Sequence, residues 1–362
     1  MTATSPLLQP YRLGDLELPT RVVMAPLTRS RATHDANAPT ELMAEYYRQR
    51  AGAGLIISEA SQISQQGQGY IWTPGVYTPA QIAGWREITD AVRGAGGRIF
   101  IQLWHVGRVS HVALQPGGAA PVSSSAIAAK TRTILDTGFV DVSTPRALDT
   151  GEIQGVVADY ARAARNARVA GFDGVEIHGA NGYLIDQFLR DGVNKRTDRY
   201  GGSVENRVRF ALEVVDAVCR EWDPSRVGIR IAPVSPANDC ADSDPQTTFG
   251  RLVEKLAAAR IGFIHVVEGA TGGPRDYLPF DYRALRESFP GTYIANNGYT
   301  RTSADAAIAN GAADLIAFGR PFIANPDLVE RFKKDAPLAE PDPATFYGGD
   351  AHGYTDYPAM TE

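Results

Sequence analysis

The sequence contains very little cysteine, with Cys219 and Cys240 the only two in 362 residues. A disulfide-stabilised fold needs more cysteines than this, and the absence of a Cys-x-x-Cys pair argues against a zinc or iron–sulfur site. The first ten residues contain neither a basic region nor an apolar run of the kind that directs secretion. We therefore expect a protein of a reducing compartment, the cytoplasm.

Long apolar runs and excess positive charge are also missing. No stretch approaches the roughly 20 apolar residues needed to span a bilayer, so we expect no membrane association. The 36 Lys and Arg residues are outnumbered by 41 Asp and Glu, the net charge is −5, and no dense basic stripe occurs. Nucleic acid is therefore not an expected partner. The composition is that of an enzyme acting on small molecules, as a monomer or a small homo-oligomer.

Short β-branched apolar runs alternate along the chain with longer segments of helical periodicity, the pattern of repeated βα units. Eight units indicate an α/β fold, a closed (β/α)8 barrel in a single domain of residues 1–362. The alternative is an open doubly wound sheet, but the Gly-x-Gly-x-x-Gly expected after an early strand of a nucleotide-binding sheet is absent. The expected strands are residues 21–24, 54–59, 98–103, 173–178, 226–231, 263–267, 292–295 and 313–318.

Two segments lie outside this repeat. Residues 11–18 alternate around a Gly-Asp turn, which predicts a hairpin that closes the barrel floor. Roughly forty residues separate the third strand from the helix near Gly151, far more than an ordinary βα loop contains. We interpret them as an excursion that covers the active-site face, with a small hairpin around residues 134–142. Their β-branched and aromatic content argues against the alternative, a disordered insertion.

The fourth strand runs directly into three polar side chains, His178, Asn181 and Tyr183. In a barrel, the C-terminal ends of the strands form the active site. His178 and Asn181 can donate hydrogen bonds to an oxygen that gains charge, while the phenol of Tyr183 can give a proton to a neighbouring carbon. This arrangement predicts activation of a carbonyl.

Other strands carry polar side chains near the same end. Thr28 offers a hydroxyl to a ligand, although threonine in this position also serves as a helix N-cap. Gln102 can both donate and accept, which suits the edge of a heterocycle. Arg230 lies in an apolar run and requires a partner, either Glu176 on the preceding strand or a cofactor carbonyl that becomes anionic on reduction. The neighbouring strand ends favour the cofactor.

The last two units contain glycine pairs where barrels often bind phosphate. Asn297-Gly298 follows the seventh strand and Gly319-Arg320 follows the eighth. Glycine lets backbone N–H groups approach the oxygens, and a helix N-terminus favours negative charge. Either pair alone would be an ordinary turn, but together they predict a phosphate site.

Longer motifs support a more specific interpretation. The chain contains His178-x-x-Asn181-x-Tyr183, Met24-Ala25-Pro26-Leu27-Thr28-Arg29, a segment from Asn194 to Arg207 and a segment from Phe318 to Leu328. In this order, between Tyr11 and Tyr357, they resemble the Old Yellow Enzyme family of flavin-dependent ene-reductases. The ending from Phe346 to Pro358 is similar to bacterial members that reduce N-ethylmaleimide, nitrate esters and 2-cyclohexenone.

The resemblance implies a barrel with non-covalent FMN, NADPH or NADH as reductant, and no metal. It implies that Thr28 binds the flavin C4 oxygen, that the Ala60 backbone contacts the ring and that Gln102 and Arg230 hold the pyrimidine edge. Pro26 and Asn297 would be further cofactor contacts, and Gly298, Gly319 and Arg320 would bind the phosphate.

For the substrate, the resemblance implies that His178 and Asn181 donate hydrogen bonds to a carbonyl or nitro oxygen. Flavin N5 would deliver hydride to the β-carbon of an electron-poor alkene and Tyr183 would protonate the α-carbon, with Trp72, Trp104 and Tyr347 as apolar walls. Threonine rather than cysteine at position 28 argues against the thermostable subgroup.

Two alternatives share the fold and cofactor. A dienoyl thioester reductase would need an additional nucleotide-binding domain and an iron–sulfur cluster, for which the chain lacks both length and cysteines. A flavin-binding sensor would need no proton donor, so Tyr183 beside His178 favours catalysis.

Overall fold

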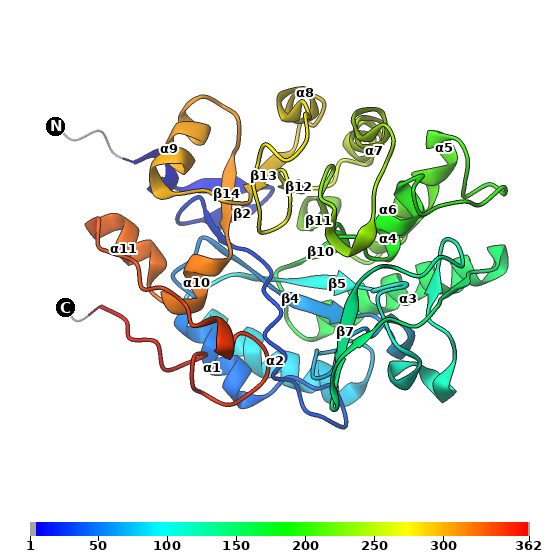
Figure 1. The fold of residues 1–362 in the computed structure, drawn as a ribbon. Coiled ribbons are helices and arrows are strands. Elements are labelled where there is room, and N and C mark those ends of the chain that lie inside the picture. The colour runs from blue at the N-terminus through cyan, green and yellow to red at the C-terminus, as the bar shows by residue number, and fades with distance from the viewer. Residues whose placement is uncertain (1–4, 361–362) are drawn as a thin grey trace.

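Eight parallel strands close into a barrel in the computed structural model, which describes residues 5–360. The barrel order is β10-β11-β12-β13-β14-β3-β4-β5, so β5 pairs with both β4 and β10 and completes the ring. The (β/α)8 prediction is therefore confirmed (Figure 1). The barrel strands are β3 (Val22–Met24), β4 (Leu55–Gln62), β5 (Ile99–Trp104), β10 (Gly174–Gly179), β11 (Val227–Ile231), β12 (Phe263–Val267), β13 (Thr292–Asn296) and β14 (Leu315–Phe318).

Helices surround the barrel, and the longer ones have one apolar face and one wet face. In α3 (Thr150–Val169), Tyr160, Ala163 and Ala167 are fully buried at helical spacing, whereas Arg165 is exposed. The other helices are α1 (Glu41–Gln49), α2 (Pro79–Gly94), α4 (Leu184–Leu189), α5 (Val204–Arg207), α6 (Arg209–Cys219), α7 (Pro245–Ala259), α8 (Tyr282–Glu287), α9 (Arg301–Ala309), α10 (Arg320–Ala324) and α11 (Leu328–Lys334). Across residues 5–360, no helix combines the length and apolar character needed to cross a bilayer.

The floor of the barrel is closed by the predicted N-terminal hairpin. Strands β1 (Tyr11–Leu13) and β2 (Leu16–Leu18) pair antiparallel. Leu13 and Leu18 are fully buried in a cluster with Phe100 and other residues from the strands of the barrel. The hairpin therefore covers this end of the barrel with apolar side chains.

The excursion after β5 is ordered and contains a hairpin, as predicted. Strands β7 (Arg132–Leu135) and β8 (Gly138–Asp141) pair antiparallel. Two shorter strands, β6 (Val122–Ser123) and β9 (Arg146–Ala147), pair parallel at its base. The hairpin bonds to the loop after β4: the Ile71 N–H donates to the Ile134 carbonyl over 3.4 Å, and the Thr133 hydroxyl donates to the Gly69 carbonyl.

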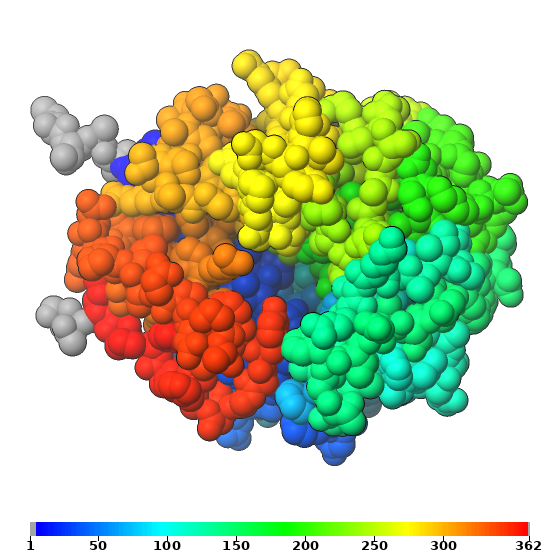
Figure 2. Space-filling view, viewed as in Figure 1, coloured from blue at the N-terminus to red at the C-terminus, as the bar shows by residue number. Residues whose placement is uncertain are grey.

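A C-terminal segment crosses the same end of the barrel. Arg29, buried after β3, donates through Nε to the Phe346 carbonyl (2.8 Å) and through Nη2 to the carbonyls of Thr345 (3.2 Å) and Gly353 (2.9 Å). Figure 2 shows a hollow at the centre of this face, bordered by the excursion, the loop near residue 272 and this C-terminal segment.

Candidate active site

The hollow is a cavity of about 800 Å³ at the carboxyl ends of the strands. Residues that follow five strands line it: 25–30 after β3, Asn181 and Tyr183 after β10, 271–273 after β12, 297–299 after β13 and 319–321 after β14. Ile134 and Phe139 of the hairpin, with Phe346 and Tyr347 of the C-terminal segment, complete the rim. Phe139 and Tyr347 are 63% and 61% exposed, so large aromatic surfaces flank the entrance.

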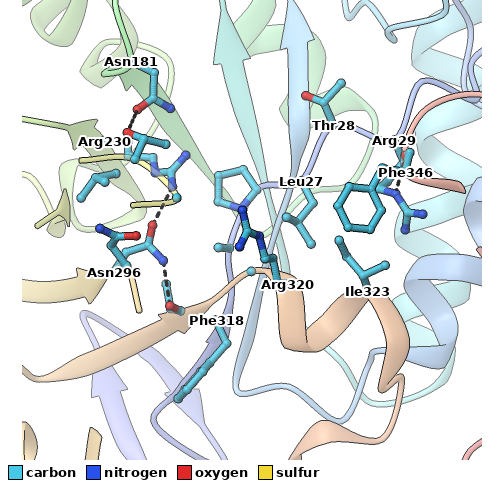
Figure 3. A pocket seen from close by; sticks show the side chains of 18 of the residues that line it. Leu27, Thr28, Arg29, Asn181, Arg230, Asn296, Phe318, Arg320, Ile323 and Phe346 are labelled. Atoms are coloured by element: carbon cyan, nitrogen blue, oxygen red, sulfur yellow. Dashed lines mark hydrogen bonds between the residues drawn. The ribbon is translucent and has the colours of Figure 1, made fainter. Parts of the chain in front are cut away.

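The residues predicted after the fourth strand are brought together. The rings of His178 and Tyr183 meet edge to face with centroids 5.0 Å apart. Asn181 has a φ of +59°, a left-handed conformation that asparagine tolerates better than most residues. Its Oδ1 accepts a hydrogen bond of 2.7 Å from the Thr271 hydroxyl, so its NH₂ group remains available as a donor (Figure 3).

Hydrogen bonding and burial fix the charge states of His178 and Tyr183. His178 Nδ1 accepts from the Ala180 N–H (3.3 Å), which leaves the proton on Nε2. Burial, with Arg230 and His265 nearby, holds the pKa of His178 well below its usual value, so the ring is a neutral donor. Burial raises the pKa of Tyr183, so its phenol keeps a proton at neutral pH.

Aromatic packing fixes the Tyr183 phenol from two sides. Trp104 meets its ring edge to face at 5.0 Å, and Tyr70 stacks on Trp104 at 5.7 Å. The hydroxyls of Tyr70 and Tyr183 lie 3.1 Å apart and share a hydrogen bond. The predicted wall residue Trp104 therefore lines the cavity next to the proton-bearing group.

Arg230 is buried and lines the cavity. It does not form a hydrogen bond with Glu176. Its Nη2 donates to Asn296 Oδ1 over 2.7 Å, whereas Glu176 is bonded to Gln102 (2.6 Å) and His265 (2.8 Å). Glu176 is not a hydrogen-bonding partner of Arg230, because its two oxygens accept from Gln102 and His265, but its charge counteracts the lowering of the Arg230 pKa by burial. Arg230 Nε is buried without a hydrogen-bond partner, as expected of a donor that awaits a ligand acceptor.

Thr28 and Pro26 also line the cavity. Thr28 does not cap a helix: the N-cap of α1 is Thr40, whose hydroxyl accepts from the Met43 N–H (3.3 Å). No described residue forms a hydrogen bond with the Thr28 side chain. Its hydroxyl is therefore available to a ligand.

The predicted phosphate residues lie together at one end of the cavity. Gly298 has a φ of +66°, and Gly319 directly precedes α10, of which Arg320 is the first residue. Arg320 is exposed and forms no ion pair with any residue in the described part of the chain. Asn297 differs from the expectation: its Nδ2 donates to the carbonyls of Glu268, Ala270 and Gly273, so the side chain holds the loop after β12.

Four predicted site residues are not among those that line the cavity, namely Ala60, Gln102, His178 and Trp72. Ala60 and Gln102 pair across β4 and β5, and His178 contacts Trp104 and Tyr183, which both line the cavity. Trp72 has a φ of +59° and stacks on His34 with centroids 4.6 Å apart, and its ring lies beside Gly348, next to the rim residue Tyr347.

Several lining residues were not anticipated. Asn296 and Thr271 orient Arg230 and Asn181, and both lie at or after strand ends, where a wider search of the strand ends would have found them. Phe139 lies in the predicted hairpin and Phe346 in the C-terminal motif, although neither side chain was assigned to the cavity, and Tyr70 comes from a loop without periodicity.

Comparisons with known proteins identify the family of this chain. The model of the NADH:flavin oxidoreductase / NADH oxidase family matches residues 6–339. The chain is 50% identical to 12-oxophytodienoate reductase 1 of Oryza sativa subsp. japonica, over 99% of this chain and 94% of that protein. It is 46% identical to 12-oxophytodienoate reductase 2 of Arabidopsis thaliana, over 98% of this chain and 96% of that protein.

Two solved structures are also similar to this chain in sequence and fold. Morphinone reductase in complex with tetrahydroNAD has a TM-score of 0.94 and 48% identity, over 99% of this chain and 98% of that one. The Old Yellow Enzyme homologue from Zymomonas mobilis has a TM-score of 0.94 and 44% identity, over 98% of this chain and 99% of that one. The chain therefore belongs to the NADH:flavin oxidoreductase / NADH oxidase family, and within it to the Old Yellow Enzyme group of FMN-dependent ene-reductases.

Proposed function

We propose that this FMN-dependent NAD(P)H oxidoreductase reduces activated C=C bonds with His178 and Asn181 as the carbonyl-binding pair and Tyr183 as the proton donor. The proposal rests on the protonation and hydrogen bonding of these three side chains. His178 is a neutral Nε2–H donor, Asn181 has only its NH₂ free, and Tyr183 is protonated. Two neutral donors beside one weak acid match an oxygen that gains charge and a carbon that gains a proton.

The chain's own residues fit FMN. The unpartnered Nε of Arg230 meets the need of a ring edge that becomes anionic on reduction, and the free Thr28 hydroxyl offers a second donor. Gly298, Gly319 and Arg320 would hold the phosphate at the other end of the cavity, with Asn297 acting through the loop that it fixes. FMN, when bound, takes hydride from the nicotinamide and supplies it to the alkene.

The protein side of the reaction is binding, orientation and proton transfer. His178 and Asn181 would hold the substrate oxygen, which withdraws electrons from the conjugated alkene. Tyr183 would give its proton to the α-carbon and regain one afterwards. Trp104 and the exposed rims of Phe139 and Tyr347 would pack the apolar part of the substrate. Nicotinamide would occupy the same space in turn.

The same donor pair would accept nitro compounds and nitrate esters, since their oxygens accept hydrogen bonds as a carbonyl does. We further propose the cytoplasm as the compartment, on the low cysteine content, and a single domain; the predicted bounds 1 and 362 lie outside the described residues 5–360.

The test is Tyr183→Phe. The variant should keep reduction of its flavin by NADPH or NADH and lose roughly 10²- to 10⁴-fold in alkene reduction, since only that step needs the proton. Stopped-flow absorbance separates the two steps, and Tyr160→Phe, a fully buried phenol on α3, is the matched control. If both half-reactions of Tyr183→Phe fell together, the assignment of Tyr183 would be wrong.

A further inference from the structure

One buried carboxylate inside the barrel has no part in the reaction as described. Glu176 lies on β10 two residues before His178, so the two side chains project from the same side of the strand. Its Oε1 accepts from Gln102 Nε2 over 2.6 Å, and its Oε2 accepts from His265 Nδ1 over 2.8 Å. All three side chains are buried, which makes this a closed network below the cavity.

The network contains one net negative charge. Burial lowers the pKa of His265, so the ring is neutral and donates its Nδ1 proton to the carboxylate. Gln102 is neutral as well. The charge of the Glu176 carboxylate is therefore not cancelled by either group that it touches.

That charge lies close to Arg230, because His265, which contacts the Glu176 carboxylate, is the cross-strand neighbour of Arg230. Burial lowers the pKa of Arg230, and Glu176 is the largest influence in the opposite direction. Arg230 in turn lines the cavity and is bonded to the neutral Asn296 (Figure 3). The electrostatic field on a ligand beside Arg230 therefore comes from both the positive guanidinium and the negative Glu176 carboxylate.

We propose that Glu176 is a positioning residue that lowers the reduction potential of bound FMN by offsetting the charge of Arg230. The inference rests on the proposed placement of the flavin edge beside Arg230. Arg230 stabilises the anionic reduced cofactor, and Glu176 limits that stabilisation. The reduced cofactor is consequently a stronger hydride donor than Arg230 alone would allow.

The test is the midpoint potential of FMN-loaded Glu176→Gln, measured by equilibrium titration with reference dyes. The substitution keeps the shape and removes the charge. The ratio of reduced-FMN affinity to oxidised-FMN affinity should rise on the order of tenfold, a positive shift of about 30 mV for a two-electron couple. Asp173→Asn is the matched control, because it removes one negative charge at the opposite end of β10, where the carboxylate accepts from the Ile99 N–H.

A yellow Glu176→Gln protein with the potential of the wild type would overturn the proposal, as would an equal shift in Asp173→Asn. If Glu176→Gln does not fold, Glu176→Asp decides, since it keeps the charge and shortens the contact with Gln102. Its potential should match the wild type, and a displaced potential would identify Glu176 as structural support only. Failure of the wild type to bind FMN would instead contradict the proposed function.

Discussion

The hydroxyl oxygens of Tyr70 and Tyr183 are 3.1 Å apart, and both phenols are enclosed by Trp104. Burial raises the pKa of Tyr183, and the hydrogen bond from Tyr70 counteracts that increase. Tyr70 comes from the loop between β4 and α2, so two distant segments combine to set the acidity of one proton donor.

Tyr70→Phe should therefore slow alkene reduction about tenfold, because Tyr183 loses the donor that stabilises its phenolate and becomes a weaker acid. Reduction of the flavin by NADPH should be unchanged. Stopped-flow traces of both half-reactions in the variant check this. An unchanged rate of alkene reduction would show that Tyr183 does not depend on Tyr70.

His178→Ala should weaken the binding of simple phenols by about tenfold or more, since the variant removes one of two neutral donors. Absorbance titration of the FMN-loaded enzyme with a phenol measures the dissociation constant. His178→Gln retains a donor and should recover part of the affinity. Equal affinities in the wild type and the alanine variant would rule out His178 as an oxygen ligand.

Acid should destabilise the protein through its buried histidines. Burial lowers the pKa of His105 to about 3 and also lowers the pKa values of His178 and His265. In the unfolded chain these rings take up protons as the pH falls through about 6.5, while in the folded chain they do not. Stability is therefore complete above that pH and is lost below it.

Glu59 opposes this trend, because burial raises its pKa to about 7 and folding then favours its protonated form. Three histidines against one glutamate mean that the unfolded chain takes up more protons than the folded chain from these four groups. The free energy of unfolding should therefore fall as the pH decreases through about 6.5 toward 5. Guanidinium unfolding of the FMN-loaded enzyme measures it, and His105→Gln should reduce the slope by about 1.4 kcal/mol per pH unit.

Arg29→Lys should loosen the C-terminal part of the cavity rim. Lysine keeps the charge but cannot present the planar fork that binds the carbonyls of Thr345, Phe346 and Gly353. We expect KM for 2-cyclohexenone to rise about tenfold, since Tyr347 is no longer fixed at the entrance. Limited proteolysis between residues 345 and 353 should accelerate, and an unchanged cleavage pattern would contradict the role of Arg29.

The sequence predicted the barrel well because its strands are short β-branched runs that end in glycine or polar residues. Only β4 is markedly longer than expected: it continues to Gln62 through a bulge between Ile57 and Ala60 that keeps it paired with β5. The hairpin β7–β8 was also found, since alternation and a turn are local signals.

Side-chain partners were harder to predict. The alternative that paired Arg230 with Glu176 was partly right: the carboxylate acts on Arg230 through its charge, but it accepts from His265 across the intervening strand β11, a contact that chain neighbourhood does not indicate. Trp72 was assigned to the wall from the resemblance, yet its ring stacks on His34 and it does not line the cavity. Tyr70 lies in a loop, where neither periodicity nor spacing indicates which way a side chain points.

The hydrogen bonds between the β7–β8 hairpin and the residues Gly69 and Ile71 fix the chain on both sides of Tyr70. An engineer who grafts a foreign hairpin onto this scaffold to admit bulkier reactants would thereby also disturb proton delivery, so entrance size and turnover cannot be tuned separately at this position.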